Sequence, residues 1–305
     1  MKPWARWCRS ALRRGSSAAY VLFLVTLVVS ACRARQHGPS RADSNPTPTS
    51  GPPVLLASAT PNPEPIQSPS ASTPTLEPAV PSPPVQSTAG TRDVIYRSGT
   101  LELEGTLCIP QGSGPFPAVV YNHGGAGEVI GGAPRETCEA LARDGLVGFS
   151  PIRRSTRELD GHLDDVLAAV EYVRRLDFVD PQRLGIMGFS RGGLLTFQAA
   201  ARRPDFRAVV LMAPAPGGQD ELQQSLSEAA TVSAPVLILV AENDVVQANH
   251  VQLSHIVRDA LDSAGKQVEL ILYPPFGNDG HLMFFEIGEY WSDVHQFFAE
   301  YLAQE

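Results

Sequence analysis

Short apolar runs alternate with amphipathic segments along residues 92–305, and this alternation limits the folds open to the chain. Runs such as PFPAVVY, RLGIMGF, FRAVVLM and PVLILV are almost continuously apolar, as in strands buried on both faces. Between them, segments such as HLDDVLAAVEYVRRLD place apolar residues on one helical face, and the last such stripe begins at Ile287. DVIYRSG and LELEGTLCIP are typical of a strand pair at the edge of the sheet. We therefore expect an α/β fold, with a mostly parallel sheet covered by helices on both faces.

The first 31 residues are typical of an export signal, with a basic start and an apolar run from Ala18 to Ala31. That run is shorter than the roughly 20 residues that span a bilayer. It ends in Val29, Ser30, Ala31 and Cys32, which resembles the bacterial lipoprotein box, so we expect lipid on Cys32 and attachment to the outer face of a bacterial membrane. Cleavage after Ala31 without lipidation and an uncleaved anchor remain open, and all three alternatives place the body outside the cytoplasm.

Residues 32–91 are rich in proline, serine and threonine and almost free of aromatic residues, so burial cannot offset the entropy of ordering them. We expect a disordered tether there, followed by one domain over residues 92–305. The net charge is -8, with most of the basic excess in the first forty residues. The body therefore lacks the clustered Lys and Arg that binding to nucleic acid requires.

Cofactor and metal motifs are missing from the sequence. The histidines show no HExxH spacing and the cysteines no CxxC, and no dinucleotide fingerprint opens the first helix, so we expect no metal and no cofactor. Cys108 and Cys138 are the two cysteines of the body. A disulfide between them and two buried free thiols both remain open, because spacing alone does not give their separation in space.

The segment IMGFSRGG joins an apolar strand to a helix and contains the pattern GxSxG around Ser190. A strand that passes into a helix through one residue holds that residue in a strained turn, where side chains two positions away would clash. Gly188 and Gly192 relieve that clash, and the turn exposes the serine hydroxyl. Ser190 is therefore the candidate nucleophile.

A serine hydroxyl needs a base to accept its proton and an acid to orient that base. His281 is the candidate base, because it lies in a loop after the last apolar strand, at the carboxyl edge where parallel sheets carry functional groups. The turn AEND after an earlier strand offers Asp244 as the acid, with Glu242 as the alternative. The histidines on or beside amphipathic helices, for which we expect solvated or core-edge roles, are His162, His250, His255 and His295.

Two backbone N–H groups are candidates for an oxyanion hole. The N–H of Arg191 lies at the start of the helix after Ser190, where the helix dipole favours negative charge. The segment YNHGGAG should supply the second donor from Gly125, or alternatively Gly124, because glycine lets the backbone approach a substrate oxygen. We expect the ring of His123 to brace this segment, with contact to substrate as the alternative.

Two further clusters have competing interpretations. Arg153 and Arg154 follow a strand and either favour an anionic substrate or form surface ion pairs, and we favour the ion pairs. The apolar run Met283, Phe284 and Phe285 either lines an acyl pocket or belongs to the core, and we favour the core.

Taken together, these segments resemble the α/β-hydrolase superfamily, and within it the dienelactone-hydrolase-like or acyl-esterase branch. The matching segments PFPAVVYNHGGAG, DDVLAAVEYVRRLDFVDPQRLGIMGFSRGG, PVLILVAENDVV and YPPFGNDGHLMFF cover nearly all of residues 92–305. The chain order of Ser190, Asp244 and His281 is also that of the superfamily. Dienelactone hydrolases proper use cysteine as the nucleophile, so Ser190 favours a serine esterase. Residues 214–235 hold only a short helical pattern, and we expect no large cap domain.

We therefore expect an extracytoplasmic serine hydrolase that acts on small-molecule esters through an acyl-enzyme. A serine peptidase of the prolyl-oligopeptidase type and a catalytically silent binding lipoprotein remain the alternatives. Neither the acyl group, the alcohol nor the oligomeric state follows from the sequence.

Overall fold

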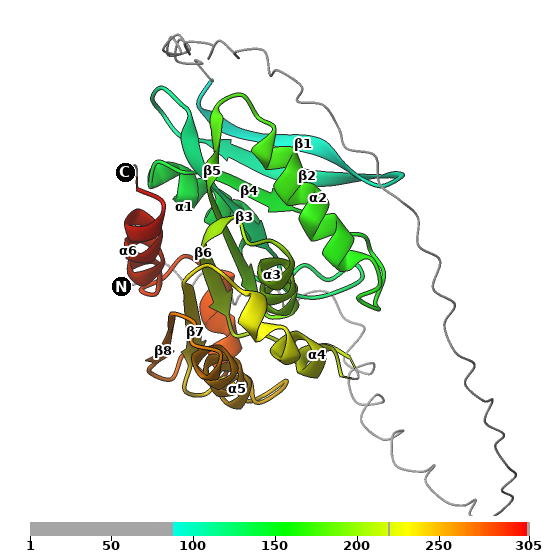
Figure 1. The fold of residues 1–305 in the computed structure, drawn as a ribbon, viewed down its shortest axis with the longest axis vertical. Coiled ribbons are helices and arrows are strands. Elements are labelled where there is room, and N and C mark those ends of the chain that lie inside the picture. The colour runs from blue at the N-terminus through cyan, green and yellow to red at the C-terminus, as the bar shows by residue number, and fades with distance from the viewer. Residues whose placement is uncertain (1–87, 219, 304–305) are drawn as a thin grey trace, which may run out of the picture. The chain divides into compact units, whose positions relative to one another are not determined.

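A single eight-stranded sheet organises the chain (Figure 1). The computed structural model describes residues 88–218 and 220–303, so the expected export signal, Cys32 and nearly all of the expected tether lie outside it. The strand order is β1-β2-β4-β3-β5-β6-β7-β8. The strands are β1 (Gly90–Ser98), β2 (Leu101–Ile109), β3 (Phe116–Asn122), β4 (Val147–Pro151), β5 (Val179–Phe189), β6 (Phe206–Met212), β7 (Val236–Ala241) and β8 (Val268–Tyr273).

The sheet is mostly parallel. β1 pairs with β2 and β2 with β4 in antiparallel fashion, and every pair from β4 through β3 to β8 is parallel. The edge strand pair and the parallel sheet expected from the sequence are both confirmed. Parallel strands need crossover connections, which here are helices for most pairs. The helices are α1 (Pro134–Arg143), α2 (His162–Arg174), α3 (Arg191–Arg202), α4 (Glu221–Ser227), α5 (His250–Ser263) and α6 (Trp291–Tyr301), with 3₁₀ helices η2 (Ala229–Thr231) and η3 (Gly280–Phe285).

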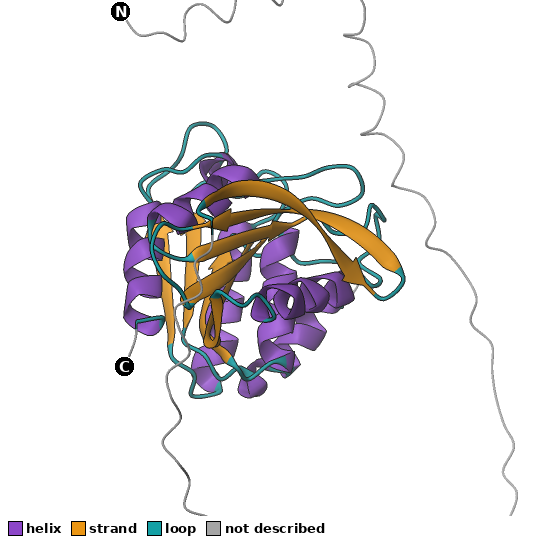
Figure 2. Ribbon diagram, turned by 90° about the horizontal axis from the view of Figure 1, so that it is seen from above, coloured by secondary structure: helices purple, strands orange, loops and turns teal. Residues whose placement is uncertain are grey.

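Helices cover both faces of the sheet (Figure 2). α1 and α6 pack on one face, while α2, α3 and α5 pack on the other. Side chains along β3 alternate between the two faces of the sheet. Ala118 and Val120 belong to the core under α2 and α3. Val119 and Tyr121 belong to the core under α1 and α6. A strand buried on both faces must be apolar throughout, as the sequence pattern indicated.

Helix boundaries follow the local chemistry of the chain. Pro134 opens α1, where its missing N–H costs nothing, and Gly145 follows that helix with a φ of 85° that favours glycine. Asn249 caps α5 by accepting a hydrogen bond from the N–H of Gln252 at 2.9 Å. The last helix begins at Trp291, so Ile287 precedes it, contrary to the expected stripe. Across residues 88–303 other than 219, no helix is long and apolar enough to cross a bilayer.

Cys108 in β2 and Cys138 in α1 form a disulfide with a Cα–Cα distance of 5.6 Å. Both residues are fully buried. The bond ties the antiparallel edge of the sheet to the helix that covers it, and it decides between the two alternatives that the sequence left open.

Candidate active site

Ser190 lies between β5 and α3 in a backbone conformation that only glycine adopts readily. Its φ is 54° and its ψ is -117°, and such a conformation costs on the order of 1–3 kcal/mol, so it persists only where the surroundings fix it. The Ser190 N–H donates to the carbonyl of Met212 at 2.9 Å, and the Ser190 carbonyl accepts from Leu194 and Ala215 at 3.1 and 3.0 Å. The side chain stays partly exposed. The expected strained turn is therefore present.

Glycines on both sides of Ser190 make that turn possible. A methyl group on Gly188 would overlap the carbonyl of Gly192 and the hydroxyl of Thr196. A methyl group on Gly192 would overlap the carbonyl of Asn122 at the end of β3. The two glycines thus relieve the predicted clash, and they let the turn pack directly against the neighbouring strand.

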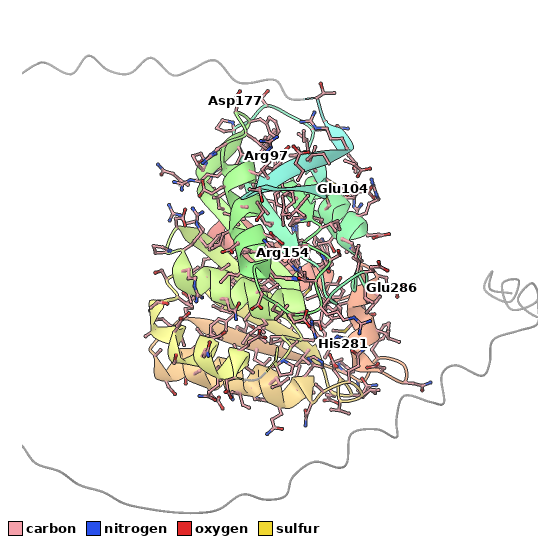
Figure 3. All side chains as sticks on the ribbon, turned by 90° about the vertical axis from the view of Figure 1, so that its right-hand side faces the viewer. Arg97, Glu104, Arg154, Asp177, His281 and Glu286 are labelled. Atoms are coloured by element: carbon pink, nitrogen blue, oxygen red, sulfur yellow. A yellow bond between two sulfur atoms is a disulfide. The ribbon has the colours of Figure 1, made fainter. Side chains whose placement is uncertain are left out.

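His281 and Asp244 form a buried hydrogen-bonded pair at the carboxyl edge of the sheet (His281 is labelled in Figure 3). His281 Nδ1 lies 2.8 Å from Asp244 Oδ2 and 3.1 Å from Oδ1. The side chains are 3% and 0% exposed, so water competes little for this bond. Glu242 is exposed and its N–H belongs to the backbone pairing with Tyr273, so the structure pairs His281 with the first of the two candidate acids.

The pair lies beside the serine turn. The ring of Phe189, the residue before Ser190, packs against the His281 ring with centroids 4.5 Å apart. Within the part of the chain that the structure describes, no hydrogen bond joins Ser190 Oγ to His281. Such bonds are often long in enzymes without substrate and tighten when substrate binds. The structure thus gathers the three predicted side chains at one sheet edge, with the histidine–aspartate bond already formed.

The loop after β3 distinguishes between the two glycines proposed as oxyanion donors. The N–H of Gly124 donates to the carbonyl of Gly131 at 2.9 Å, and the N–H of Gly131 donates back at 3.0 Å. Gly124 is therefore not available as a donor, because this backbone pair occupies its N–H. Gly125 remains, with a φ of 76° that glycine adopts without strain. The loop lies over the nucleophile, since a methyl group on Gly124 would come within 3.2 Å of Ser190 Cβ.

His123 braces this loop, as expected. Its Nδ1–H donates to the carbonyl of Gly124 at 2.7 Å, and its Nε2 accepts from the N–H of Arg153 at 3.4 Å. Both bonds suit the neutral ring, because protonated Nε2 would point its own hydrogen at a donor. Burial, and then the positive charge of Arg153, lower the pKa of His123 to about 3. The ring is therefore neutral at pH 7.

The two arginines after β4 differ from the expectation of surface ion pairs. Arg154 does pair, with Nη2 at 2.7 Å from Oδ1 of Asp165, but that carboxylate is fully buried. For Arg153 the predicted surface ion pair is wrong, because the residue is only 3% exposed. Its guanidinium donates to His162 Nδ1 at 3.3 Å and to the Gly125 carbonyl at 3.4 Å. Burial lowers its pKa to about 10, so it stays charged at pH 7 beneath the loop that carries Gly125.

His250 is a site residue that sequence reasoning missed. It opens α5, is 2% exposed, and stacks on His281 with ring centroids 4.3 Å apart and an interplanar angle of 29°. Its N–H donates to the carbonyl of Asp244 at 3.0 Å. Burial lowers the pKa of His250, so the ring supports His281 without adding charge. Its position just six residues after Asp244 was a usable signal. His162, for which a solvated or core-edge role was expected, is also buried.

Asp244, His250 and His281 bring one potential metal-ligating atom each within 4.8 Å of the others. The two imidazole rings are stacked, however, and ring nitrogen lone pairs lie in the ring planes. Nearly parallel rings do not aim these lone pairs at one point. The arrangement therefore favours hydrogen bonding and stacking over ligation.

The run after His281 divides between core and surface. Met283 and Phe284 are buried, as favoured from the sequence. Phe285 is 45% exposed, yet its ring meets Phe189 edge-on with centroids 5.7 Å apart. Phe285 therefore lies at the surface beside the serine turn and not in the core.

Comparison with known proteins places this arrangement in a family. Residues 152–302 match the sequence model of the Dienelactone hydrolase family. A protein of Aquifex aeolicus named "Putative carboxymethylenebutenolidase" is 25% identical over 50% of this chain and 71% of its own length. A bis(hydroxyethyl) terephthalate hydrolase of Streptomyces coelicolor is 33% identical over 35% of this chain and 33% of its own.

Solved structures share the fold. A "Putative Dienelactone Hydrolase" from Klebsiella pneumoniae superposes with a TM-score of 0.58 at 22% identity, covering 72% of this chain and all of that one. Acylaminoacyl peptidases also superpose, over only 40–42% of their own length. Identities this low show the fold alone. The matched family and the shared fold together show that the chain is a hydrolase of the α/β-hydrolase superfamily, in its dienelactone-hydrolase-like branch.

Proposed function

We propose that this protein is an extracytoplasmic serine hydrolase that cleaves carboxylic esters through Ser190, His281 and Asp244. One observation carries the proposal: a serine held in a strained, partly exposed turn shares a sheet edge with a buried histidine–aspartate pair. Strain at a single serine is retained where function requires it. A neutral histidine whose Nδ1 bonds a carboxylate keeps Nε2 free to accept a proton.

The reaction follows from these positions. His281 Nε2 accepts the Ser190 proton as Oγ attacks the ester carbonyl carbon, and Asp244 holds the tautomer and stabilises the imidazolium that forms. The N–H groups of Arg191 and Gly125 bind the oxyanion. His281 then protonates the leaving alcohol, and the acyl group stays on Ser190. Water, activated by the same histidine, releases the acid.

The proposed location rests on the N-terminal sequence and on the disulfide. Residues 1–31 and Cys32 carry the features of a lipoprotein export signal. A buried Cys108–Cys138 disulfide supports the same conclusion, because such bonds persist in oxidising compartments. We therefore propose that the hydrolase is held outside the cytoplasm by lipid on Cys32, with the segment from Cys32 to the start of β1 as a tether; the expected boundary at residue 91 is two residues too late, because Gly90 and Thr91 pair with β2.

A peptidase of the same fold is the second candidate, because acylaminoacyl peptidases are among the structural neighbours. Those peptidases match this chain over less than half of their length, so most of each lies outside the shared fold. The names of the relatives support both candidates: one relative is a bis(hydroxyethyl) terephthalate hydrolase, and another, from Bacillus subtilis, is named an uncharacterized peptidase and is 25% identical over 60% of this chain. Comparing p-nitrophenyl acetate with aminoacyl p-nitroanilides separates the two candidates, and faster anilide cleavage would favour the peptidase.

The role of Asp244 gives the kinetic test of the mechanism. We expect Asp244→Asn to lower kcat for p-nitrophenyl acetate by about 10³–10⁴-fold, because an amide no longer holds the required tautomer. Glu242→Gln is the matched control, since that carboxylate is exposed two residues away. Equal losses in the two variants would reject the assigned acid.

A further inference from the structure

Exposed apolar side chains are concentrated in the connections that carry the proposed site residues. Among the described residues, eleven large apolar side chains are substantially exposed, and seven of them come from the connections that follow β3, β7 and β8; Phe276, at 37%, is the least exposed of the seven and is set aside here. The other six, which we call the apolar rim, are Val129, Ile130, Val245, Val246, Leu282 and Phe285, and they are 44–65% exposed. Apolar surface that clusters in this way marks a binding surface, whereas apolar residues scattered singly do not.

One side of the rim adjoins the proposed oxyanion loop. A methyl group on Gly125 would overlap the Val129 carbonyl and lie 3.2 Å from Val129 Cγ1, so the Val129 side chain covers the glycine whose N–H is the proposed donor. Ile130 is next to Gly131, which pairs with Gly124 over Ser190 Cβ. An acyl group attached to Ser190 therefore starts beside the loop that carries Val129 and Ile130.

The other side of the rim adjoins the nucleophile and the base. Phe285 packs edge-on against Phe189, the residue before Ser190. Leu282 follows His281 in η3, and Val245 follows Asp244, so the predicted base and the predicted acid each have an exposed apolar neighbour in the sequence. The rim residues thus come from the same short segments as the proposed catalytic residues.

The exposed charges on the three connections that carry the rim are acidic, and Arg191 beside the nucleophile donates its Nη1–H to the carbonyl of Arg157 at 2.8 Å. Glu128, Glu242 and Glu286 are exposed in the same loops, and Figure 3 labels Glu286 with His281 on this side of the molecule. Arg154 is engaged by Asp165, and Arg153 is buried beneath the loop. Neither arginine is presented to a substrate carboxylate.

We propose that the apolar rim binds the acyl chain of neutral, apolar esters, and that Val129 and Phe285 set the preference for long chains. This inference rests on the proposed ester hydrolysis. The acyl chain is the occupant, because the carbonyl carbon must lie between Ser190 and the loop covered by Val129. A second copy of the chain on the rim would block that position.

The test is the dependence of kcat/KM on acyl length, measured with p-nitrophenyl acetate, butyrate, hexanoate and octanoate on the full-length protein. Full burial of a methylene is worth about 4-fold, so half-burial on an exposed rim predicts about 2-fold per methylene. The expected rise from acetate to octanoate is therefore several tens-fold. A carboxylate at the end of the acyl chain, as in p-nitrophenyl hydrogen adipate, should lower kcat/KM at least 10-fold relative to hexanoate.

Substitutions in the apolar rim test whether Val129 and Phe285 determine the preference for long acyl chains. In Val129→Ser and Phe285→Ser the octanoate-to-acetate ratio should fall about 5- to 10-fold, while Phe285→Leu should retain most of it. Ile95→Ser is the matched control, because Ile95 is 55% exposed on β1, in the antiparallel edge pair, and should leave the ratio unchanged. Thermal unfolding confirms that each variant is folded.

The possible negative results distinguish this inference from the proposed function. Acetate hydrolysis with a flat length profile would overturn this inference alone, as would a preference for the charged ester. Rim variants that alter self-association by size-exclusion chromatography but leave the ratio intact would identify a second copy as the occupant and also overturn it. No hydrolysis of any ester would overturn the proposed function, and this inference with it.

Discussion

Ser190 and His123 show how single residues near the site depend on their surroundings. The strained backbone of Ser190 is fixed by hydrogen bonds from three different segments, so it does not relax into the helix that follows. His123 is held neutral between a carbonyl and an N–H. Both residues therefore link the stability of the fold to the geometry of the site.

The buried neutral His123 makes the fold sensitive to acid. Its pKa is about 3 in the folded chain and about 6.5 when unfolded, so the unfolded state takes up a proton first as the pH falls. The stabilisation is complete above about pH 6.5 and is lost as the pH falls towards 3. Between pH 7.5 and 5.0 this residue should account for a loss of about 2 kcal/mol in the free energy of unfolding.

Urea unfolding at the two pH values measures this loss. His123→Asn should reduce the difference by about 2 kcal/mol, because asparagine does not titrate. His255→Asn is the control, at a partly exposed position on α5 away from the loop. An unchanged difference in His123→Asn would contradict the assignment.

At the residue scale, the sequence predicted which residues lie at the strand ends. It did not predict which side chains become buried when helices and loops pack against the sheet. The positions of Ser190, Asp244 and His281 at the carboxyl edge followed from the sequence because each residue comes after an apolar strand, and their catalytic roles stay a prediction. His250 and Arg153 could not be assigned in the same way, since their burial depends on where α5 and the loop after β4 pack. Periodicity shows that a histidine starts a helix, but not that its ring stacks on another ring.

The elements around the site interlock through glycine. The turn at Ser190 between β5 and α3 contacts the end of β3 at Gly192, where there is no room for a side chain. The order and type of the elements followed from the apolar periodicity. A strand buried on both faces is apolar throughout, whereas a helix that covers a sheet is apolar on one face only. Boundaries such as the start of α6 at Trp291 depended on packing that the pattern does not contain.

Gly192→Ala tests the contact between the turn at Ser190 and β3. Its methyl group would overlap the Asn122 carbonyl, so backbone must move, and we expect a loss of roughly 1–3 kcal/mol in stability. Activity should fall further, because the movement displaces Ser190. Gly288→Ala is the control, since the nearest atom to its added methyl lies at 3.8 Å. Calorimetry on both variants checks the prediction, and equal melting temperatures would contradict it.

At the scale of the whole molecule, the disulfide joins the antiparallel side of the sheet to α1, and the proposed catalytic groups lie at the carboxyl edge of the parallel strands. The Cys108–Cys138 bond closes a segment with a sequence separation of 30. Loop-closure entropy for that length corresponds to about 3–4 kcal/mol, or roughly 10 °C in melting temperature for a domain of this size. The doubly substituted Cys108→Ser/Cys138→Ser chain should melt lower by that amount.

Reductant provides the internal check on the disulfide. Wild-type protein incubated with dithiothreitol under mildly unfolding conditions should melt at the temperature of the double variant. The double variant itself should not respond to reductant. A wild-type melting temperature unaffected by full reduction would show that the bond contributes nothing to stability.

The central claim is that Ser190 is the nucleophile, and covalent labelling tests it most directly. A fluorophosphonate probe reacts with serines activated by a neighbouring base, so wild-type protein should carry one label on the peptide that contains Ser190. Ser190→Ala should carry none, and Ser233→Ala, at an exposed serine before β7, should be labelled like wild type. Labelling that survives in Ser190→Ala, or an unlabelled wild-type protein, would contradict the account.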